Sequence, residues 1–159
     1  RFFTVYGPWG RPDMALFKFT KAILENDPIE VYNFGDLTRD FTYIDDVTES
    51  IFRITNKVPV LNQNYSDYGN NPSTSWAPFQ ILNIGNSEPI KLMDYIYAIE
   101  LELNRKAKIN FCEMQKGDVK ITDSDTLKLE NLINYKPNTS IKNGVQKFVD
   151  WYKNYYKIN

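Results

Sequence analysis

The sequence contains no histidine, and Cys112 is the single cysteine among its 159 residues. Without histidine, this chain cannot supply a Ser–His–Asp triad, an imidazole general base or a histidine ligand to a metal. One cysteine can form neither an internal disulfide nor a zinc site by itself. The composition therefore excludes the enzyme classes that depend on histidine within this chain, and it predicts no metal site.

Neither sign of charge is in excess, because 19 Lys and Arg oppose 20 Asp and Glu, for a net charge of −1. Binding nucleic acid through bulk charge requires a cationic excess, so no nucleic-acid partner is expected. No apolar run approaches the roughly 20 residues that cross a bilayer, so no membrane partner is expected either. Hydrophobic residues form 42% of the chain, which is enough for the core of one domain.

The glycine pattern also lacks the fingerprints of nucleotide-binding loops. No Gly-x-Gly-x-x-Gly follows a predicted strand, and no Gly-x4-Gly-Lys-Ser/Thr occurs. A strand-like run begins at residue 1, without an initiator methionine or a signal peptide. We expect a fragment of a longer protein, and the alternative is a chain that has lost only a disordered lead-in.

What the sequence does contain is an alternation of strand-like and helix-like segments. The pattern predicts strands at 1–6, 29–32, 41–44, 79–85 and 108–113, and helices starting near 13, 46, 91, 124 and 140. Asp13 is expected to cap the first of these helices, and Asp45 and Asp46 the second. Residues 57–79 are predicted to form a long polar loop. Strands that alternate with helices indicate an α/β unit.

Arginine is scarce, with five residues against fourteen lysines, so the position of each arginine is informative. The planar guanidinium can bind a carboxylate or a phosphate through two parallel hydrogen bonds. Arg11 and Arg39 lie in predicted loops, where binding groups of α/β proteins are concentrated. The alternative for either residue is a surface ion pair.

Four separate segments resemble the motifs of one family. They are residues 4–14 (TVYGPWGRPDM), 39–46 (RDFTYIDD), 77–87 (APFQILNIGNS) and 115–119 (QKGDV). In order and spacing these segments resemble the extended short-chain dehydrogenase/reductases that act on nucleotide sugars, the NAD-dependent epimerase/dehydratases. The match is closest to UDP-glucuronate 4-epimerases, and it covers residues 1–159.

The resemblance implies that residues 1–159 are the C-terminal, substrate-binding portion of a Rossmann-like α/β enzyme. The family's glycine-rich NAD loop and catalytic Tyr-x3-Lys precede this portion, so no catalytic residue is assigned here. NAD is expected in the full-length enzyme but not on this chain, which is predicted to be inactive alone.

The implied reaction converts UDP-glucuronate to UDP-galacturonate in the cytoplasm, for capsule or cell-surface polysaccharide precursors. The alternatives are a dehydratase or decarboxylase of the same family, or an inactive truncated remnant. Strands that lack neighbours also predict a homo-oligomer or association through exposed edges.

The resemblance also assigns residues to the UDP moiety. Arg39 matches the arginine that contacts the diphosphate. Val31 and Tyr32 match the short strand that holds the uracil, with Tyr32 stacking on the base. Asp118 matches the acid that accepts hydrogen bonds from the ribose. The alternatives are an aromatic core residue at Tyr32 and a turn residue at Asp118.

Two further residues are assigned to the sugar. Thr4 and Arg11 match the positions that hold the sugar carboxylate in UDP-glucuronate epimerases. A desolvated carboxylate without a partner costs several kcal/mol, so a cation is needed there. This pair is the reason for preferring a uronate to a neutral hexose.

Overall fold

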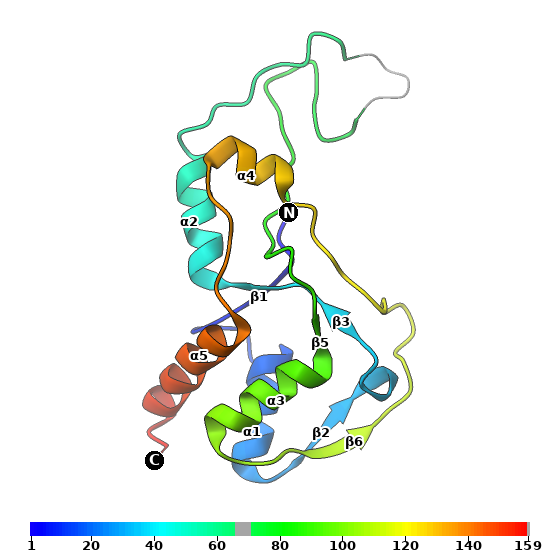
Figure 1. The fold of residues 1–159 in the computed structure, drawn as a ribbon, viewed down its shortest axis with the longest axis vertical. Helices are drawn as coiled ribbons and strands as arrows, with labels where there is room; N and C mark the ends of the chain where they lie inside the picture. The colour runs from blue at the N-terminus through cyan, green and yellow to red at the C-terminus, as the bar shows by residue number, and fades with distance from the viewer. Residues whose placement is uncertain (66–70, 159) are drawn as a thin grey trace.

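The computed structural model describes residues 1–65 and 71–158 and has a mixed α/β architecture (Figure 1). Its helices are α1 (Ala15–Glu25), α2 (Ile44–Ile54), α3 (Leu92–Leu103), α4 (Leu127–Ile133) and α5 (Ile141–Tyr156), with a short 3₁₀ helix η1 (Tyr32–Gly35). Its strands are β1 (Thr4–Tyr6), β2 (Pro28–Val31), β3 (Thr38–Arg39), β4 (Phe41–Tyr43), β5 (Ile90–Lys91) and β6 (Lys108–Phe111). The predicted fold class is confirmed.

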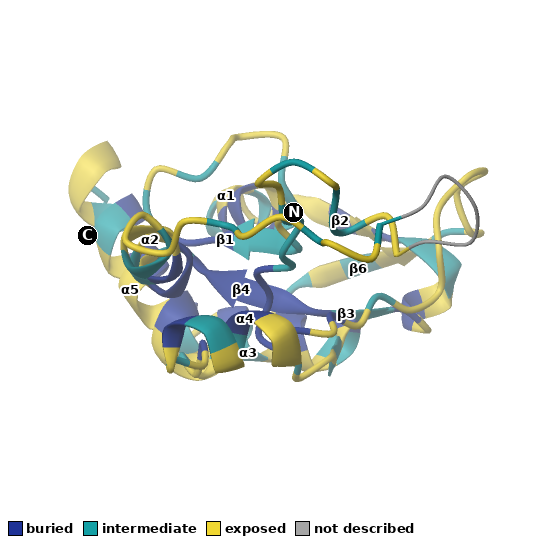
Figure 2. Cartoon of the chain, turned by 90° about the horizontal axis from the view of Figure 1, so that it is seen from above, coloured by how far each residue is buried: buried dark blue, intermediate teal, exposed yellow. Residues whose placement is uncertain are grey.

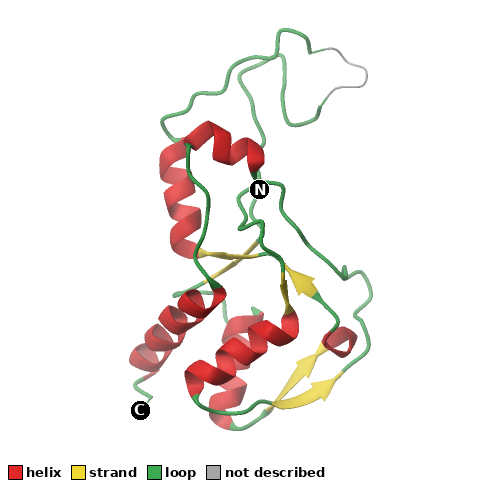
Figure 3. Ribbon diagram, viewed as in Figure 1, coloured by secondary structure: helices red, strands yellow, loops and turns green. Residues whose placement is uncertain are grey.

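The strands pair over long separations in the chain (Figure 3). β1 lies parallel to β4, with Thr4 opposite Phe41, and β2 lies parallel to β6, with Ile29 opposite Ile109. β3 and β5 form a short antiparallel pair. Parallel pairs need crossover connections, and α1 lies in the connection from β1 to β4 while α3 lies in that from β2 to β6.

The main hydrophobic core lies where α1, α3 and α5 meet β1 and β4. β4 appears as a buried segment in Figure 2, whereas β1 is mostly half-buried. The apolar residues of each helix recur at three- and four-residue spacing, so one face of each helix is buried. The core includes Leu16, Phe17, Ile23, Tyr95, Ile96, Ile99, Val145, Phe148 and Val149. A smaller cluster of Val47, Ile84, Leu129 and Ile133 lies between α2 and α4.

The predicted strand at 79–85 is wrong. Ile84 forms an isolated parallel bridge with Phe2, and Gln80 forms an isolated antiparallel bridge with Thr74. The residues between them join no ladder within the described chain. An apolar run forms a strand only where a neighbouring backbone offers a continuous row of partners, and Phe2 offers a single bridge here.

The predicted caps also differ from the structure. Met14, not Asp13, is the N-cap of α1, and Tyr43 is the N-cap of α2, with Asp45 and Asp46 in the first turn of that helix. The described parts of the predicted 57–79 loop carry turns and the Thr74 bridge, while residues 66–70 lie outside the described residues. Among the described helices, none combines the length and the apolar character needed to span a bilayer.

Candidate substrate-binding site

A cavity of about 500 Å³, called the main cavity below, opens between α1, the β2–η1 segment, β3 and the segment after β6. Four of the residues assigned from the sequence line it: Thr4, Tyr32, Arg39 and Asp118. Val31 is fully buried beside Tyr32 and does not line the cavity. The structure therefore brings together residues that are as many as 114 positions apart in the chain.

Arg39 is the most firmly held cation of the cavity. Its Nη1 donates to the carbonyl oxygens of Thr38 at 2.9 Å and Lys120 at 3.0 Å. Its Nη2 donates to Asp118 Oδ1 at 2.8 Å, and only 15% of the arginine side chain is exposed. A guanidinium fixed in this way presents a planar, preorganised donor edge, which suits recognition of a phosphate or carboxylate.

The residue after Arg39 explains why this strand is so well fixed. Asp40 is fully buried, and its carboxylate accepts hydrogen bonds from the backbone amides of Asn86, Ser87 and Ser124 and from the Ser124 hydroxyl. A buried carboxylate is tolerated only when hydrogen bonds replace its hydration. Asp40 thus fixes the chain between β3 and β4 to the loops that contain Asn86 and Ser124. This restricts the backbone of the adjacent residue, Arg39.

Tyr32 begins η1 and lines the main cavity. Its hydroxyl donates to Glu30 Oε2 at 2.7 Å, and this hydrogen bond is the main cause of a raised Tyr32 pKa, with Gln115 acting in the opposite direction. The ring is partly buried and packs against the edge of the core. Tyr32 is therefore a cavity-wall aromatic and not a fully buried core residue.

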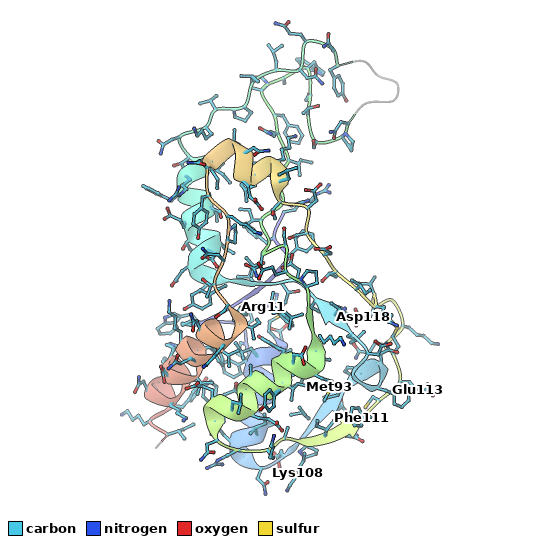
Figure 4. The ribbon with its side chains drawn as sticks, viewed as in Figure 1. Arg11, Met93, Lys108, Phe111, Glu113 and Asp118 are labelled. Carbon is cyan, nitrogen blue, oxygen red and sulfur yellow. The ribbon has the colours of Figure 1, made fainter. Side chains whose placement is uncertain are left out.

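Arg11 does not line the main cavity. It lies in the 7–14 loop, where it pairs with Asp13 at 3.1 Å and is largely exposed (Figure 4). Arg11 lines a more open hollow of about 730 Å³ together with Thr4, Trp9 and Met14, called the Arg11 hollow below. Thr4 of β1 lines both the cavity that contains Arg39 and the hollow that contains Arg11.

Sequence reasoning missed Lys18, Glu30 and Gln115 as cavity residues. Lys18 could have been found from helical periodicity, because it shares a face of α1 with Ala15 and Ala22, which also line the cavity. Glu30 carries no comparable signal, since its position depends on the path of β2. Gln115 begins the 115–119 segment that resembles a family motif, and that resemblance could have indicated it.

Comparisons with known proteins identify related sequences and structures. Residues 1–66 match the model of the NAD dependent epimerase/dehydratase family. In sequence and fold, the chain is similar to members of that family. It is 51% identical over 157 residues to the protein CapI of Staphylococcus aureus, covering 99% of this chain and 47% of CapI. It is 45% identical over 159 residues to a probable UDP-glucuronate 4-epimerase of Rhizobium meliloti, covering 99% of this chain and 46% of that protein.

A solved structure gives the same relationship in three dimensions. UDP-glucuronic acid 4-epimerase from Bacillus cereus, crystallised with UDP-glucuronic acid and NAD, superposes with a TM-score of 0.79 at 31% identity. The alignment covers 98% of this chain and 45% of that enzyme. The chain thus spans about half the length of the relatives it matches.

The family implies NAD, and the loop between β1 and α1 tests whether these residues fit it. A dinucleotide pyrophosphate is normally held by free amides of a glycine-rich loop that enters a helix. Here Pro8 and Pro12 have no N–H, and the Gly10 amide donates to the Gly7 carbonyl at 3.1 Å. Within the described chain, this strand–loop–helix does not fit a dinucleotide.

Proposed function

We propose that residues 1–159 form the substrate-binding, C-terminal portion of an NAD-dependent nucleotide-sugar epimerase. The substrate is UDP-glucuronate and the product UDP-galacturonate, a precursor for capsule or cell-surface polysaccharide made in the cytoplasm. NAD and the catalytic residues belong to the part of the full-length enzyme that this chain does not contain. Residues 57–79 are a long polar loop within the substrate-binding portion.

The position of Thr4 between two spaces is the observation that carries this proposal. The main cavity offers the aromatic ring of Tyr32, the cation of Arg39 and the carboxylate of Asp118, which suit a base, a diphosphate and a ribose. The Arg11 hollow shares Thr4 with the main cavity and offers a second cation. A nucleotide in the main cavity would place a sugar carboxylate towards Thr4 and Arg11.

Two arginine variants of the full-length enzyme separate the two spaces. Arg39→Ala should weaken UDP and UDP-sugars together, because the diphosphate is common to both. Arg11→Ala should leave UDP affinity unchanged and lower kcat/KM for UDP-glucuronate. Since Arg11 is open to solvent, we expect the lower end of the range for loss of one partner of a charge pair, about 2 kcal/mol or roughly 30-fold.

The measurements are calorimetric titration with UDP and epimerisation assays with the uronate and a neutral UDP-sugar. Arg105→Ala is the matched control, because Arg105 donates to the Leu24 carbonyl and lines neither space. If Arg11→Ala damages UDP binding as severely as Arg39→Ala does, Arg11 is a phosphate ligand or a structural residue. The uronate assignment would then lose its support.

Self-association is a separate expectation of the proposal. Phe2, just before β1, is 60% exposed, and Phe111 on β6 is 50% exposed. Exposed apolar side chains beside short strands favour pairing with another molecule. Light scattering of the 159-residue chain should show a dimer or a larger species, and a stable monomer would contradict this expectation.

A further inference from the structure

The donor edge of Arg39 is already occupied by a carboxylate from the same chain. The segment 112–122 follows β6 along the outside of the molecule, past η1 and β3 (Figure 1). It brings Asp118 to the main cavity, where Asp118 Oδ1 lies 2.8 Å from Arg39 Nη2. A phosphate that approaches Nη2 of Arg39 would therefore compete with Asp118 for that nitrogen.

We propose that Asp118 is an internal placeholder for the ligand phosphate. Its carboxylate occupies Arg39 in the free protein, and the diphosphate of a bound nucleotide displaces it. This inference rests on the proposed function, since it takes Arg39 as the diphosphate ligand. The carboxylate keeps the cation neutralised until a ligand with greater negative charge arrives.

The fixed part of this exchange is the arginine. Its Nη1 is held by the carbonyls of Thr38 and Lys120, and neither bond involves Asp118. The guanidinium can therefore change its anionic partner without moving. A preorganised donor of this kind loses little conformational freedom on binding, which favours exchange of one anion for another.

The movable part is the turn that carries Asp118. Gly117 has φ of +85°, and no atom lies within 4 Å of the position where a Cβ would be. Asp118 is one-third exposed. Beyond it the segment is anchored again, because the Thr38 amide donates to the Lys120 carbonyl and the Thr122 amide to the Thr38 carbonyl. Movement is thus confined to a short turn next to the cavity.

Inorganic pyrophosphate tests the exchange without a base or a ribose. In calorimetric titrations of the 159-residue chain at fixed ionic strength, Asp118→Asn should tighten pyrophosphate binding roughly three- to tenfold, since the competing partly exposed ion pair is gone. Asp118→Glu, which retains the charge, should bind as the parent does. Asp118→Asn should increase the affinity for UDP less than the affinity for pyrophosphate if the displaced Asp118 carboxylate accepts hydrogen bonds from the ribose.

Asp36→Asn is the matched control. Asp36 pairs at 2.7 Å with Lys120, which lies in the 112–122 segment. Asp36→Asn therefore changes the net charge by the same amount as Asp118→Asn but removes no contact of the Arg39 side chain. Its pyrophosphate affinity should stay within about twofold of the parent, as for a surface ion pair. If Asp118→Asn binds pyrophosphate no more tightly than Asp36→Asn does, the proposal that Asp118 is a placeholder is overturned.

Arg39→Ala separates the two proposals. If it loses pyrophosphate binding while Asp118→Asn gains none, the placeholder fails and the diphosphate site stands. If Arg39→Ala binds pyrophosphate as the parent does, Arg39 is no phosphate ligand, and both proposals fall.

Discussion

Gly144 of α5 packs directly against the ring and hydroxyl of Tyr6 on β1, leaving no room for a Cβ atom. A methyl group at position 144 would lie 2.6 Å from ring atoms Cε2 and Cζ of Tyr6. The ring cannot move aside easily, because it makes edge-to-face contacts with Phe41, Tyr43 and Tyr95. This contact sets the distance between α5 and the strand that carries Thr4 into the site.

Gly144→Ala should therefore destabilise the protein. Alanine is better than glycine within a helix by about 1 kcal/mol, but overpacking of a core typically costs 1–3 kcal/mol. The difference is a net loss of about 0–2 kcal/mol. Because a 2.6 Å contact with a confined ring is severe, we expect the upper half of that range, about 1–2 kcal/mol in the free energy of unfolding, measured by urea denaturation. Gln146→Ala, at an exposed position of the same helix, is the control and should change stability by less than about 0.5 kcal/mol. Equal stability of the two variants would show that α5 can shift away from β1.

The helices could be predicted from the sequence because the information is local. α1, α3 and α5 present apolar residues at helical spacing, and each buries that face. The strand at 79–85 could not be judged locally, since its backbone partner is Phe2, some 80 residues away. Periodicity shows that a segment is apolar on both faces but does not show which backbone lies beside it.

The candidate site also has a part that could be predicted from the sequence and a part that could not. Arg39, Tyr32 and Thr4 could be assigned by resemblance, and the structure places them on one cavity. The ion pair between Arg39 and Asp118 joins residues 79 positions apart, and spacing alone cannot predict such a pair. The placement of Arg11 in a different hollow depends on the path of the 7–14 loop, which is equally a tertiary property.

The adjacent carboxylates Asp45 and Asp46 have different roles, and their variants should differ accordingly. Asp46 is buried, and it accepts hydrogen bonds from the Tyr135 hydroxyl at 2.7 Å and the Thr139 amide at 3.0 Å. Asp45 is exposed, 3.6 Å from Lys147 Nζ. Hydrogen bonds to a charged acceptor contribute about 1.5–3 kcal/mol, whereas exposed ion pairs contribute about 0–1 kcal/mol.

Asp46→Asn should consequently lower the free energy of unfolding by about 2 kcal/mol, and Asp45→Asn by less than about 0.5 kcal/mol. Thermal and urea melts of both variants provide the comparison. Both substitutions remove one negative charge from the first turn of α2, so the helix-dipole contribution is matched. Similar losses in the two variants would mean that the helix dipole, and not the bonds to Tyr135 and Thr139, accounts for the effect.

Alkaline pH should destabilise the fold through its tyrosines. Burial, together with the hydrogen bond to Asp46, raises the pKa of Tyr135 above its ordinary value of 10.0, and burial raises the pKa values of Tyr6 and Tyr95. Above pH 10 the unfolded chain releases these protons while the folded chain retains them. The stabilisation is therefore complete below pH 10 and is lost as the pH rises towards the folded-state pKa values.

Denaturation between pH 8 and pH 11.5 measures this linkage. The free energy of unfolding should fall above about pH 10, and Tyr135→Phe should make that fall shallower, because one linked group is removed. Tyr97→Phe, at an exposed tyrosine of α3, should leave the slope as it is in the parent. A slope that Tyr135→Phe leaves unchanged would assign the alkaline loss to other groups.

Tyr32 gives the most direct test of base recognition in the main cavity. Its ring lines the cavity while its hydroxyl is held by Glu30, so the ring is oriented before a ligand binds. Stacking of a base on an aromatic side chain contributes about 1–3 kcal/mol. Tyr32→Ala should therefore weaken UDP binding roughly 5- to 150-fold and leave pyrophosphate binding unchanged, because pyrophosphate has no base to stack.

Tyr32→Phe is the matched variant, since it keeps the ring and removes only the hydroxyl that Glu30 accepts from. This variant should retain most of the UDP affinity. The affinity should fall by less than about fivefold, because the lost hydrogen bond to the charged Glu30 only orients the ring. Calorimetric titration of both variants with UDP and with pyrophosphate distinguishes stacking from structural damage. If Tyr32→Ala weakens pyrophosphate as much as UDP, the ring supports the shape of the cavity around Arg39 and does not recognise the base.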